Sequence, residues 1–266
     1  MRQVVLWLAF VVARHCFAAD SPAPRVAPNY TAASIVNAAD NQSGALAPNA
    51  IATIYGVNLA FSTIGLTPGD VQGGRLPVRL GTCETMVFVG NYPANLYYVS
   101  PTQINFLVPP NMLPLPVPVY VTIDGLHGPV IDITLGPAAP GLFQLDAQNA
   151  IATLADGSLL TPTSPAHPGD IIVLYATGLG ATSPPAEYGL LSNVAAKLVP
   201  DANLQILLDG VGLDASAIAY AGAAPGNAGL YQINLTLPVS TGVNPEIKLV
   251  MGNATSAGGV HLPVSP

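Results

Sequence analysis

Charged side chains are scarce in this sequence. Only 8% of its 266 residues are Asp, Glu, Lys or Arg, where about 25% is usual for a soluble domain. The 14 acidic residues outnumber the seven basic ones. A chain with so little positive charge lacks the basic surface that a nucleic-acid backbone requires, so nucleic acid is excluded as a partner.

The glycine and proline content also excludes long uninterrupted helices and strands. The chain has 26 glycines and 27 prolines, about a fifth of its length, where roughly 12% is ordinary. Both residue types interrupt helices and strand interiors, and no segment shows a convincing amphipathic helical period. Intrinsic disorder is equally disfavoured, because 50% of the residues are hydrophobic and supply the apolar surface for a core.

The N-terminus has the pattern of a secretory signal peptide. Arg2 gives a short positive region, residues 4–13 are apolar, and small residues precede a cut after Ala18. Such a stretch is too short to span a membrane. We therefore predict a signal peptide at residues 1–18 and a secreted or cell-surface protein, extracellular or periplasmic. No transmembrane segment is expected after cleavage, since seven prolines interrupt the uncharged residues 85–123.

Removal of that leader takes away Trp7, the one tryptophan, and Cys16. Five basic and 14 acidic residues remain, a net charge of −9. Cys83 is then the last cysteine, so no internal disulfide can form. A lone cysteine in a strand region is typically a small buried hydrophobe, and an intermolecular disulfide is the alternative. Stability must come from packed apolar surface.

Short strands separated by turns dominate the rest of the chain. Residues 19–33 read as an extended linker, and the fold is expected to begin near Ser34. Runs of β-branched and aromatic residues bounded by Gly, Pro and Asn predict strands. In the first half of the chain these runs cover residues 51–55, 76–80, 86–89, 103–108, 117–123 and 129–135.

The strand pattern occurs twice. Residues 46–60 match 166–180, QINFLVP at 103–109 matches QINLTLP at 232–238, and 119–125 match 246–252. Three blocks in the same order at offsets of 120, 129 and 127 residues indicate tandem copies of one unit of about 100 residues. We predict one domain over residues 34–136 and a second over 137–266.

Alternation within each unit indicates how it folds. In residues 231–237 the odd positions are apolar and the even positions polar, which is the pattern of a strand with one buried face. Two sheets packed face to face are the natural way to bury such faces. The sequence therefore predicts an all-β fold of two tandem immunoglobulin-like β-sandwiches.

The same residues carry a family resemblance. The segments SIVNAAD (34–40), APNAIATIYGVNLA (47–60), YVSPTQINFLVP (98–109), PGLF (140–143), LYATGLG (174–180) and GLYQINLTLP (229–238) resemble the uncharacterised C-terminal domain family of secreted Solibacter-type (acidobacterial) proteins. The first unit is also similar to IPT/TIG-type immunoglobulin modules, through its proline, apolar run and the turn at 56–59. The resemblance implies an extracellular bacterial module and assigns no activity.

The sequence contains no recognisable catalytic, metal-binding or dinucleotide-binding motif. The nucleophile elbow Gly-x-Ser-x-Gly does not occur, and His127, His167 and His261 stand next to turn residues without metal-ligand spacing. The glycine pairs at 178–180 and 210–212 lack the third glycine of a dinucleotide site. We predict no catalytic residue, no cofactor and no resident metal, and hence no enzyme; calcium bound between the domains remains an alternative.

Two groups of residues are candidates for binding. Gln103 and Asn105 recur as Gln232 and Asn234 at matched strand positions. Such amides either bond the backbone of an adjacent proline-rich loop, which we favour, or form a ligand surface. Tyrosines are the second group, because sugars stack on aromatic rings; Tyr92 and Tyr188 are the candidates.

Two functions are consistent with these observations. The favoured one is a secreted, non-catalytic tandem β-sandwich for extracellular structure, adhesion or protein interaction. The alternative is an extracellular polysaccharide-binding module that uses tyrosines and loop amides. The expected partner is accordingly an extracellular protein or a polysaccharide.

Overall fold

The structure is a computed structural model that describes residues 26–81, 85–191 and 193–266. The predicted signal peptide and Cys83 lie outside the described residues. The described chain consists of antiparallel strands and turns, with four short 3-10 turns: η1 (Ala32–Ser34), η2 (Pro68–Asp70), η3 (Pro200–Ala202) and η4 (Ala215–Ala217). The predicted all-β fold is confirmed. Within these residues, no helix has the length and apolar character needed to cross a membrane.

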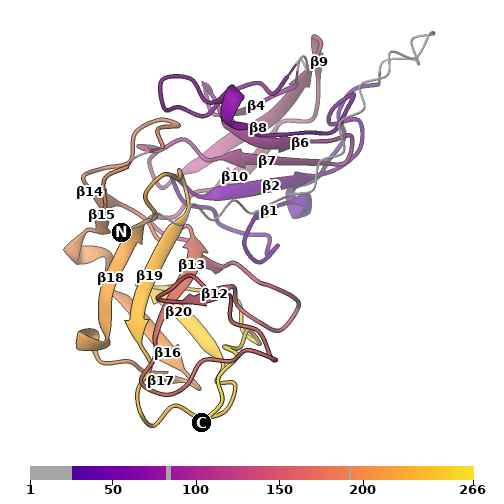
Figure 1. Cartoon of the computed structure of the whole chain (residues 1–266). Helices are drawn as coiled ribbons and strands as arrows, with labels where there is room; N and C mark the ends of the chain where they lie inside the picture. Colours follow the sequence, from indigo (N-terminus) through magenta and orange to yellow (C-terminus); the bar gives the residue numbers. More distant parts are fainter. Residues whose placement is uncertain (1–25, 82–84, 192) are drawn as a thin grey trace.

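Two sheets form the first sandwich (Figure 1). One has the order β1-β2-β7-β6-β3, with β1 (Ile35–Asn37), β2 (Ile51–Tyr55), β7 (Gln103–Leu107), β6 (Asn95–Val99) and β3 (Ile64–Gly65). The other has the order β10-β8-β4-β5, with β10 (Ile131–Thr134), β8 (Pro116–Ile123), β4 (Thr85–Val89) and β5 (Tyr92–Pro93), and β9 (Leu126–His127) pairs with β8. Ile54 and Phe106 of one sheet share a core with Val87 and Val121 of the other.

The second sandwich repeats this plan. Its larger sheet contains β11 (Gly141–Leu142), β13 (Ile171–Thr177), β19 (Tyr231–Thr236), β18 (Ile218–Ala223), β15 (Ala196–Leu198) and β14 (Thr182–Ser183) in that order, with β12 (Ala152–Leu154) on β13. Its smaller sheet has the order β17 (Val211–Gly212), β16 (Leu204–Leu208), β20 (Ile247–Met251) and β21 (Ala254–Thr255). Leu174 and Ile233 pack with Ile206 and Leu249 in its core.

The repeated sequence blocks occupy equivalent places in the two sandwiches. Strands β2 and β7 pair at the centre of one sheet, as β13 and β19 do in the other, and β8 and β20 hold matching positions opposite them. Along β19 buried residues alternate with partly exposed ones, as the sequence predicts. The prediction of tandem sandwiches is confirmed, while the domain boundary between residues 136 and 137 stays a prediction.

Two expectations need correction. Residues 76–80 do not form a strand: Leu76 and Pro77 instead hydrogen-bond singly to Gly189 and Leu96, because a proline cannot donate to a ladder. The fold also begins before Ser34. Tyr30 is 4% exposed in the first core and its hydroxyl donates to Pro129 O at 2.7 Å, so residues 28–30 belong to the sandwich and not to a linker.

An apolar cluster lies where the two sandwiches meet. Leu107 and Ala228, from opposite sandwiches, are buried in one apolar cluster. Tyr97 donates a hydrogen bond to Ala228 O, and Thr177 Oγ1 joins the two sides by accepting from Ile51 N at 2.8 Å and donating to Gly229 O at 2.6 Å. These bonds, one buried and two partly buried, compensate the desolvation of the groups that make them.

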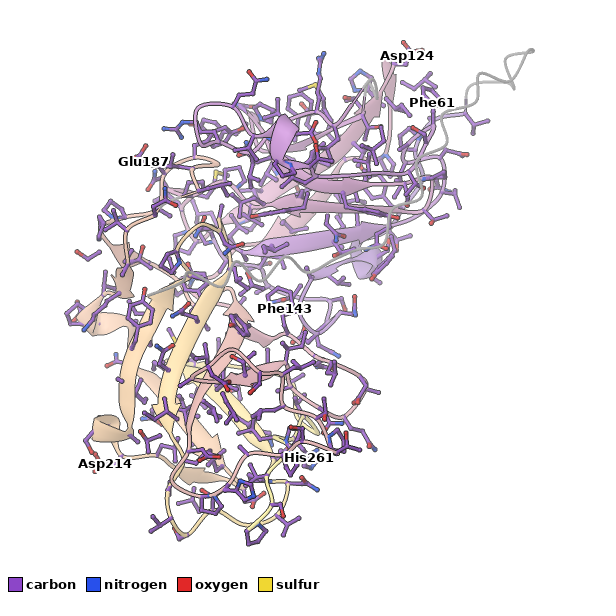
Figure 2. The ribbon with its side chains drawn as sticks, viewed as in Figure 1. Phe61, Asp124, Phe143, Glu187, Asp214 and His261 are labelled. Atoms are coloured by element: carbon purple, nitrogen blue, oxygen red, sulfur yellow. The ribbon has the colours of Figure 1, made fainter. Side chains whose placement is uncertain are left out.

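Close approach at the junction requires Gly229. Its φ is +69°, a conformation in which L side chains are strained. A Cβ atom there would lie 2.5 Å from Leu107 Cδ1 and 2.8 Å from Ile51 Cγ1. The absence of a side chain therefore lets the β18–β19 turn contact the first sandwich. Another loop of the second sandwich carries Glu187, labelled in Figure 2, which forms an ion pair with Arg75 of the first sandwich.

Substitution of Tyr97 by phenylalanine should destabilise the protein. The ring is retained, but the buried Ala228 carbonyl loses its donor, which costs about 1–3 kcal/mol. The midpoint of urea unfolding measures this loss, with Tyr92→Phe as a control at a tyrosine that is 56% exposed. Equal stability of the two variants would contradict the assigned role of the Tyr97 hydroxyl.

Candidate functional site

The outer face of the first sandwich carries a polar row on its two central strands. Tyr55 lies opposite Gln103, and Thr53 lies opposite Asn105. Gln103 Nε2 donates to Asn105 Oδ1 at 2.8 Å, and Thr53 Oγ1 donates to the same oxygen at 3.1 Å. Residues two apart on a strand share a face. The residues between them, such as Ile54, therefore point into the core.

The second sandwich has the same arrangement. Tyr175 lies opposite Gln232, Val173 lies opposite Asn234, and Gln232 Nε2 donates to Asn234 Oδ1 at 3.2 Å. The amides thus project outward together, as the alternation predicts. The expected partner is different, because the amides bond to each other along the strand and not to the backbone of a proline-rich loop.

A second tyrosine completes each row. The register of β6 against β7 shifts between Leu96 and Tyr98, and that of β18 against β19 shifts between Ile218 and Tyr220. A bulge re-aims the side chains of its strand. Tyr98 consequently faces Asn105, and Tyr220 faces Asn234.

We call these two surfaces the tyrosine–amide faces. The first comprises Tyr55, Tyr98, Gln103 and Asn105, and the second comprises Tyr175, Tyr220, Gln232 and Asn234. The two faces differ in exposure: Asn105 is only 7% exposed, whereas Asn234 is half-buried. Asn105 therefore has mainly a structural role, and the amides of the second face are the more accessible pair.

Tyr220 lies along its strand over a glycine. Its hydroxyl donates to Ala223 O at 2.7 Å, and a Cβ atom on Gly222 would be only 2.8 Å from that hydroxyl. Gly222 in turn lies opposite Gln232. Burial of the hydroxyl raises the pKa of Tyr220, so the ring stays neutral. A fixed neutral ring beside two amides offers both a stacking surface and hydrogen-bonding groups.

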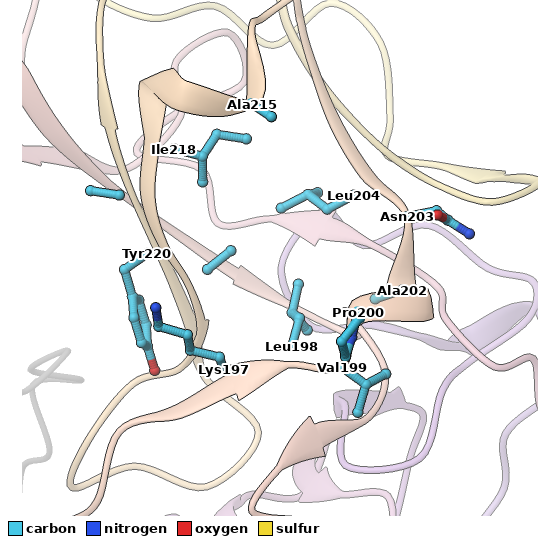
Figure 3. Close-up of a pocket in the computed structure, with 12 residues that line it drawn as sticks. Lys197, Leu198, Val199, Pro200, Ala202, Asn203, Leu204, Ala215, Ile218 and Tyr220 are labelled. Carbon is cyan, nitrogen blue, oxygen red and sulfur yellow. The ribbon is translucent and has the colours of Figure 1, made fainter.

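A hollow lined by both polar and apolar residues adjoins the second face (Figure 3). Its volume is about 340 Å³ and Tyr220 and Lys197 are among the residues that line it. Lys197 and Tyr220 lie close to the same residue, Gly222. Gly222 pairs with Lys197 on the neighbouring strand and lies beneath the Tyr220 hydroxyl. The apolar walls include Leu198, Val199, Pro200, Leu204, Ile218 and Ala221.

The tyrosines singled out from the sequence lie elsewhere. Tyr92 is exposed on β5. Tyr188 lies in the loop between β14 and β15, and Arg75 binds this loop through the Tyr188 carbonyl and, at 2.8 Å, the Glu187 carboxylate. The Tyr188 side chain is half-buried, and burial raises its pKa. Neither tyrosine belongs to a tyrosine–amide face.

An aromatic row on the other sheet of the first sandwich was not predicted. Phe88 and Tyr120 stack with ring centroids 4.9 Å apart and planes 9° apart, and His127 stacks on Tyr120 at 6.4 Å. Pro93, which follows Tyr92, lies opposite Phe88. Alternating residues at 86–88 and 120–122 indicate two strands. The alignment of the Phe88 and Tyr120 rings depends on how those strands pair.

Metal binding finds no support in the described part of the chain. There, no group of three or more His, Cys, Asp or Glu side chains is placed to hold an ion. Calcium also binds amide and backbone oxygens, so calcium between the sandwiches stays an alternative from the sequence.

Comparisons with known proteins identify no family. No family model matches the chain, and no curated protein matches it. Solved structures do match, among them the surface glycan-binding protein PbSGBP-B of Prevotella bryantii, at 12% identity and a TM-score of 0.27 over 86% of this chain and 40% of that one.

Two further matches show how broad the likeness is. SGBP-B of the Bacteroides ovatus mixed-linkage glucan utilization locus is 9% identical, with a TM-score of 0.35, over 90% of this chain and 46% of that one. The I9–I11 tandem of titin is 10% identical, with a TM-score of 0.24, over 89% and 65%. The chain spans less than half of the two glycan-binding proteins, and such TM-scores carry no argument about function.

The two asparagines should respond differently to truncation. Asn105→Ala leaves the buried Thr53 hydroxyl and the Gln103 amide without their acceptor, so we expect a loss of about 1–2 kcal/mol in the free energy of unfolding. Asn234→Ala, at a more accessible position, should cost less than about 0.5 kcal/mol. Urea denaturation of both variants measures the difference, and a larger loss for Asn234→Ala would refute the assignment.

Proposed function

We propose that this protein is a secreted, non-catalytic module that binds a neutral extracellular polysaccharide. The observation that carries the proposal is the repetition of the tyrosine–amide face on both sandwiches, at equivalent strand positions. Aromatic rings accept the apolar face of a sugar ring, and amides both donate to and accept from hydroxyls. Secretion, a bacterial source and kinship with the Solibacter-type family are parts of this proposal that rest on the sequence.

The composition of the faces favours a neutral ligand. Their eight residues carry no ionisable group other than the tyrosine hydroxyls, and Lys197 is the charged side chain that adjoins the second face. Recognition of an anionic polymer would require clustered basic residues. Two such faces on one chain, although they differ in exposure, also increase the effective concentration of binding sites for a repeating polymer.

A role in extracellular structure, adhesion or protein interaction is the second candidate. Exposed apolar residues favour it where β8 and β10 begin: Leu113 is 69%, Leu115 55% and Val130 65% exposed. Strand β10 is at one end of its sheet, and an edge strand can pair with another chain. Both strands belong to the sheet that carries no tyrosine–amide face, and because they run antiparallel, Leu115 and Val130 lie near opposite ends of β10.

Binding to a glycan array tests the proposed function, with variants at Tyr220 to locate the site. Tyr220→Ala removes the stacking surface and should weaken binding of the recognised glycan about tenfold, whereas Tyr220→Phe keeps the ring and should retain most of the affinity. Tyr175→Ala provides a second variant on the same face, and circular dichroism checks that each variant folds.

Tyr92→Ala is the matched control, because Tyr92 is exposed but outside both faces. Saturable binding that only the face variants weaken supports the proposal. The proposal is overturned if the unmodified protein gives no saturable signal on the array. It is also overturned if the control and the face variants lose binding equally. Either result leaves the protein-interaction candidate.

A further inference from the structure

A cleft of about 350 Å³, lined by both polar and apolar residues, lies between the two sandwiches. The loop after β1 contributes Asp40, Gln42 and Ser43 to one wall, and Thr255 of β21 contributes to another. The segment that connects the sandwiches, residues 138–140, also lines the cleft. The cleft therefore exists only because both sandwiches are present, and it is separate from the tyrosine–amide faces.

The walls of the cleft are held in place by hydrogen bonds. Asn37 Nδ2 donates to Ala139 O at 3.1 Å, while Asn37 Oδ1 accepts from Ala39 N at 2.9 Å. A Cβ atom on Gly141 would lie 2.6 Å from Asn37 Oδ1, so the glycine allows this close contact. A cleft built in this way is already formed before a ligand arrives, which reduces the entropic cost of binding.

Several polar groups in the cleft remain available to a ligand. Within the part of the chain that the structure describes, the amide of Gln42 and the hydroxyls of Ser43 and Thr255 make no hydrogen bond. Asp40 Oδ1 accepts from Gln42 N at 3.0 Å, which leaves acceptor capacity on its carboxylate. Burial raises the pKa of Asp40, although backbone N–H groups, including that of Ala257, oppose the shift.

The remaining surface of the cleft is small and apolar. It consists of Ala45, Ala138, Ala139, Pro140, Ala254 and Ala257. Among the described residues, no lysine, arginine or histidine lines the cleft, so no cationic side chain there would attract an anion. An apolar surface with a few convergent polar groups is the usual composition of a small-molecule site, and the volume is at the lower end of the range for such sites.

We propose that this cleft binds one residue of a neutral saccharide. A sugar hydroxyl donates to the Asp40 carboxylate, further hydroxyls bond to Gln42, Ser43 and Thr255, and the apolar face of the ring packs on the alanines and Pro140. The cleft loop also borders the first tyrosine–amide face, because Tyr55 donates to Asn41 Oδ1 at 2.8 Å. This inference rests on the proposed polysaccharide-binding function and adds a second kind of subsite to it.

Calorimetric titration of the full chain with glucose, galactose, mannose and xylose, and with their short oligomers, tests the cleft. Asp40→Asn removes the charged acceptor and Thr255→Val removes a hydroxyl at constant shape. Each should weaken binding of the recognised sugar about tenfold. Asp132→Asn and Thr134→Val on the exposed strand β10 are the matched controls and should leave binding unchanged.

Tyr220→Ala separates this proposal from the proposed function. Loss of sugar binding in the cleft variants, with retention in Tyr220→Ala, supports the cleft. Loss in Tyr220→Ala alone overturns the cleft and leaves the proposed function standing. Failure of every sugar in the panel to bind also overturns the cleft, while binding of polymers on the glycan array decides the proposed function independently. Thermal unfolding of each variant confirms folding, and Thr255→Val suffices if Asp40→Asn does not fold.

Discussion

The register of two central strand pairs, β2 with β7 and β13 with β19, is the constraint on which the rest of the structure depends. Side chains alternate between the faces of a strand, so a shift of one residue would exchange the buried and exposed sets. The observed register places Ile54 and Ile233 in the two cores and turns the Gln-x-Asn amides outward. Cores, outer faces and junction all depend on this one choice.

Stability in the described chain comes from apolar burial and from the junction between the sandwiches. Few ion pairs contribute, and Arg75 with Glu187 is a largely exposed one of the kind that adds little. The junction instead combines an apolar cluster with hydrogen bonds that cross it, from Tyr97 to Ala228 O, from Ile51 N to Thr177 and from Asn49 to the Tyr231 hydroxyl. Burial raises the pKa of Tyr231 to about 12, so this hydroxyl remains a neutral donor in the physiological pH range.

Sequence reasoning was most reliable where a pattern is local. The strand at 51–55 and the outward direction of the amides at 103 and 105 could be predicted from alternation and turn residues. It was wrong at 76–80, where Pro77 and the docking of the Gly189 loop replace a ladder. It also missed the role of Tyr98 and Tyr220, because a bulge in β6 and β18 changes which side chain faces the amide row.

The sequence by itself determined the all-β class, the duplication and the inward and outward sides of the repeated strands, because these depend on residue type and on a spacing of two. Tertiary structure alone decided which residues meet. Only in the folded chain does Phe88 stack on Tyr120, does Tyr220 lie over Gly222, and do Asp40 and Thr255 line one cleft between the two sandwiches. Such contacts join segments far apart in the chain, and their geometry depends on strand order and docking, which local spacing does not encode.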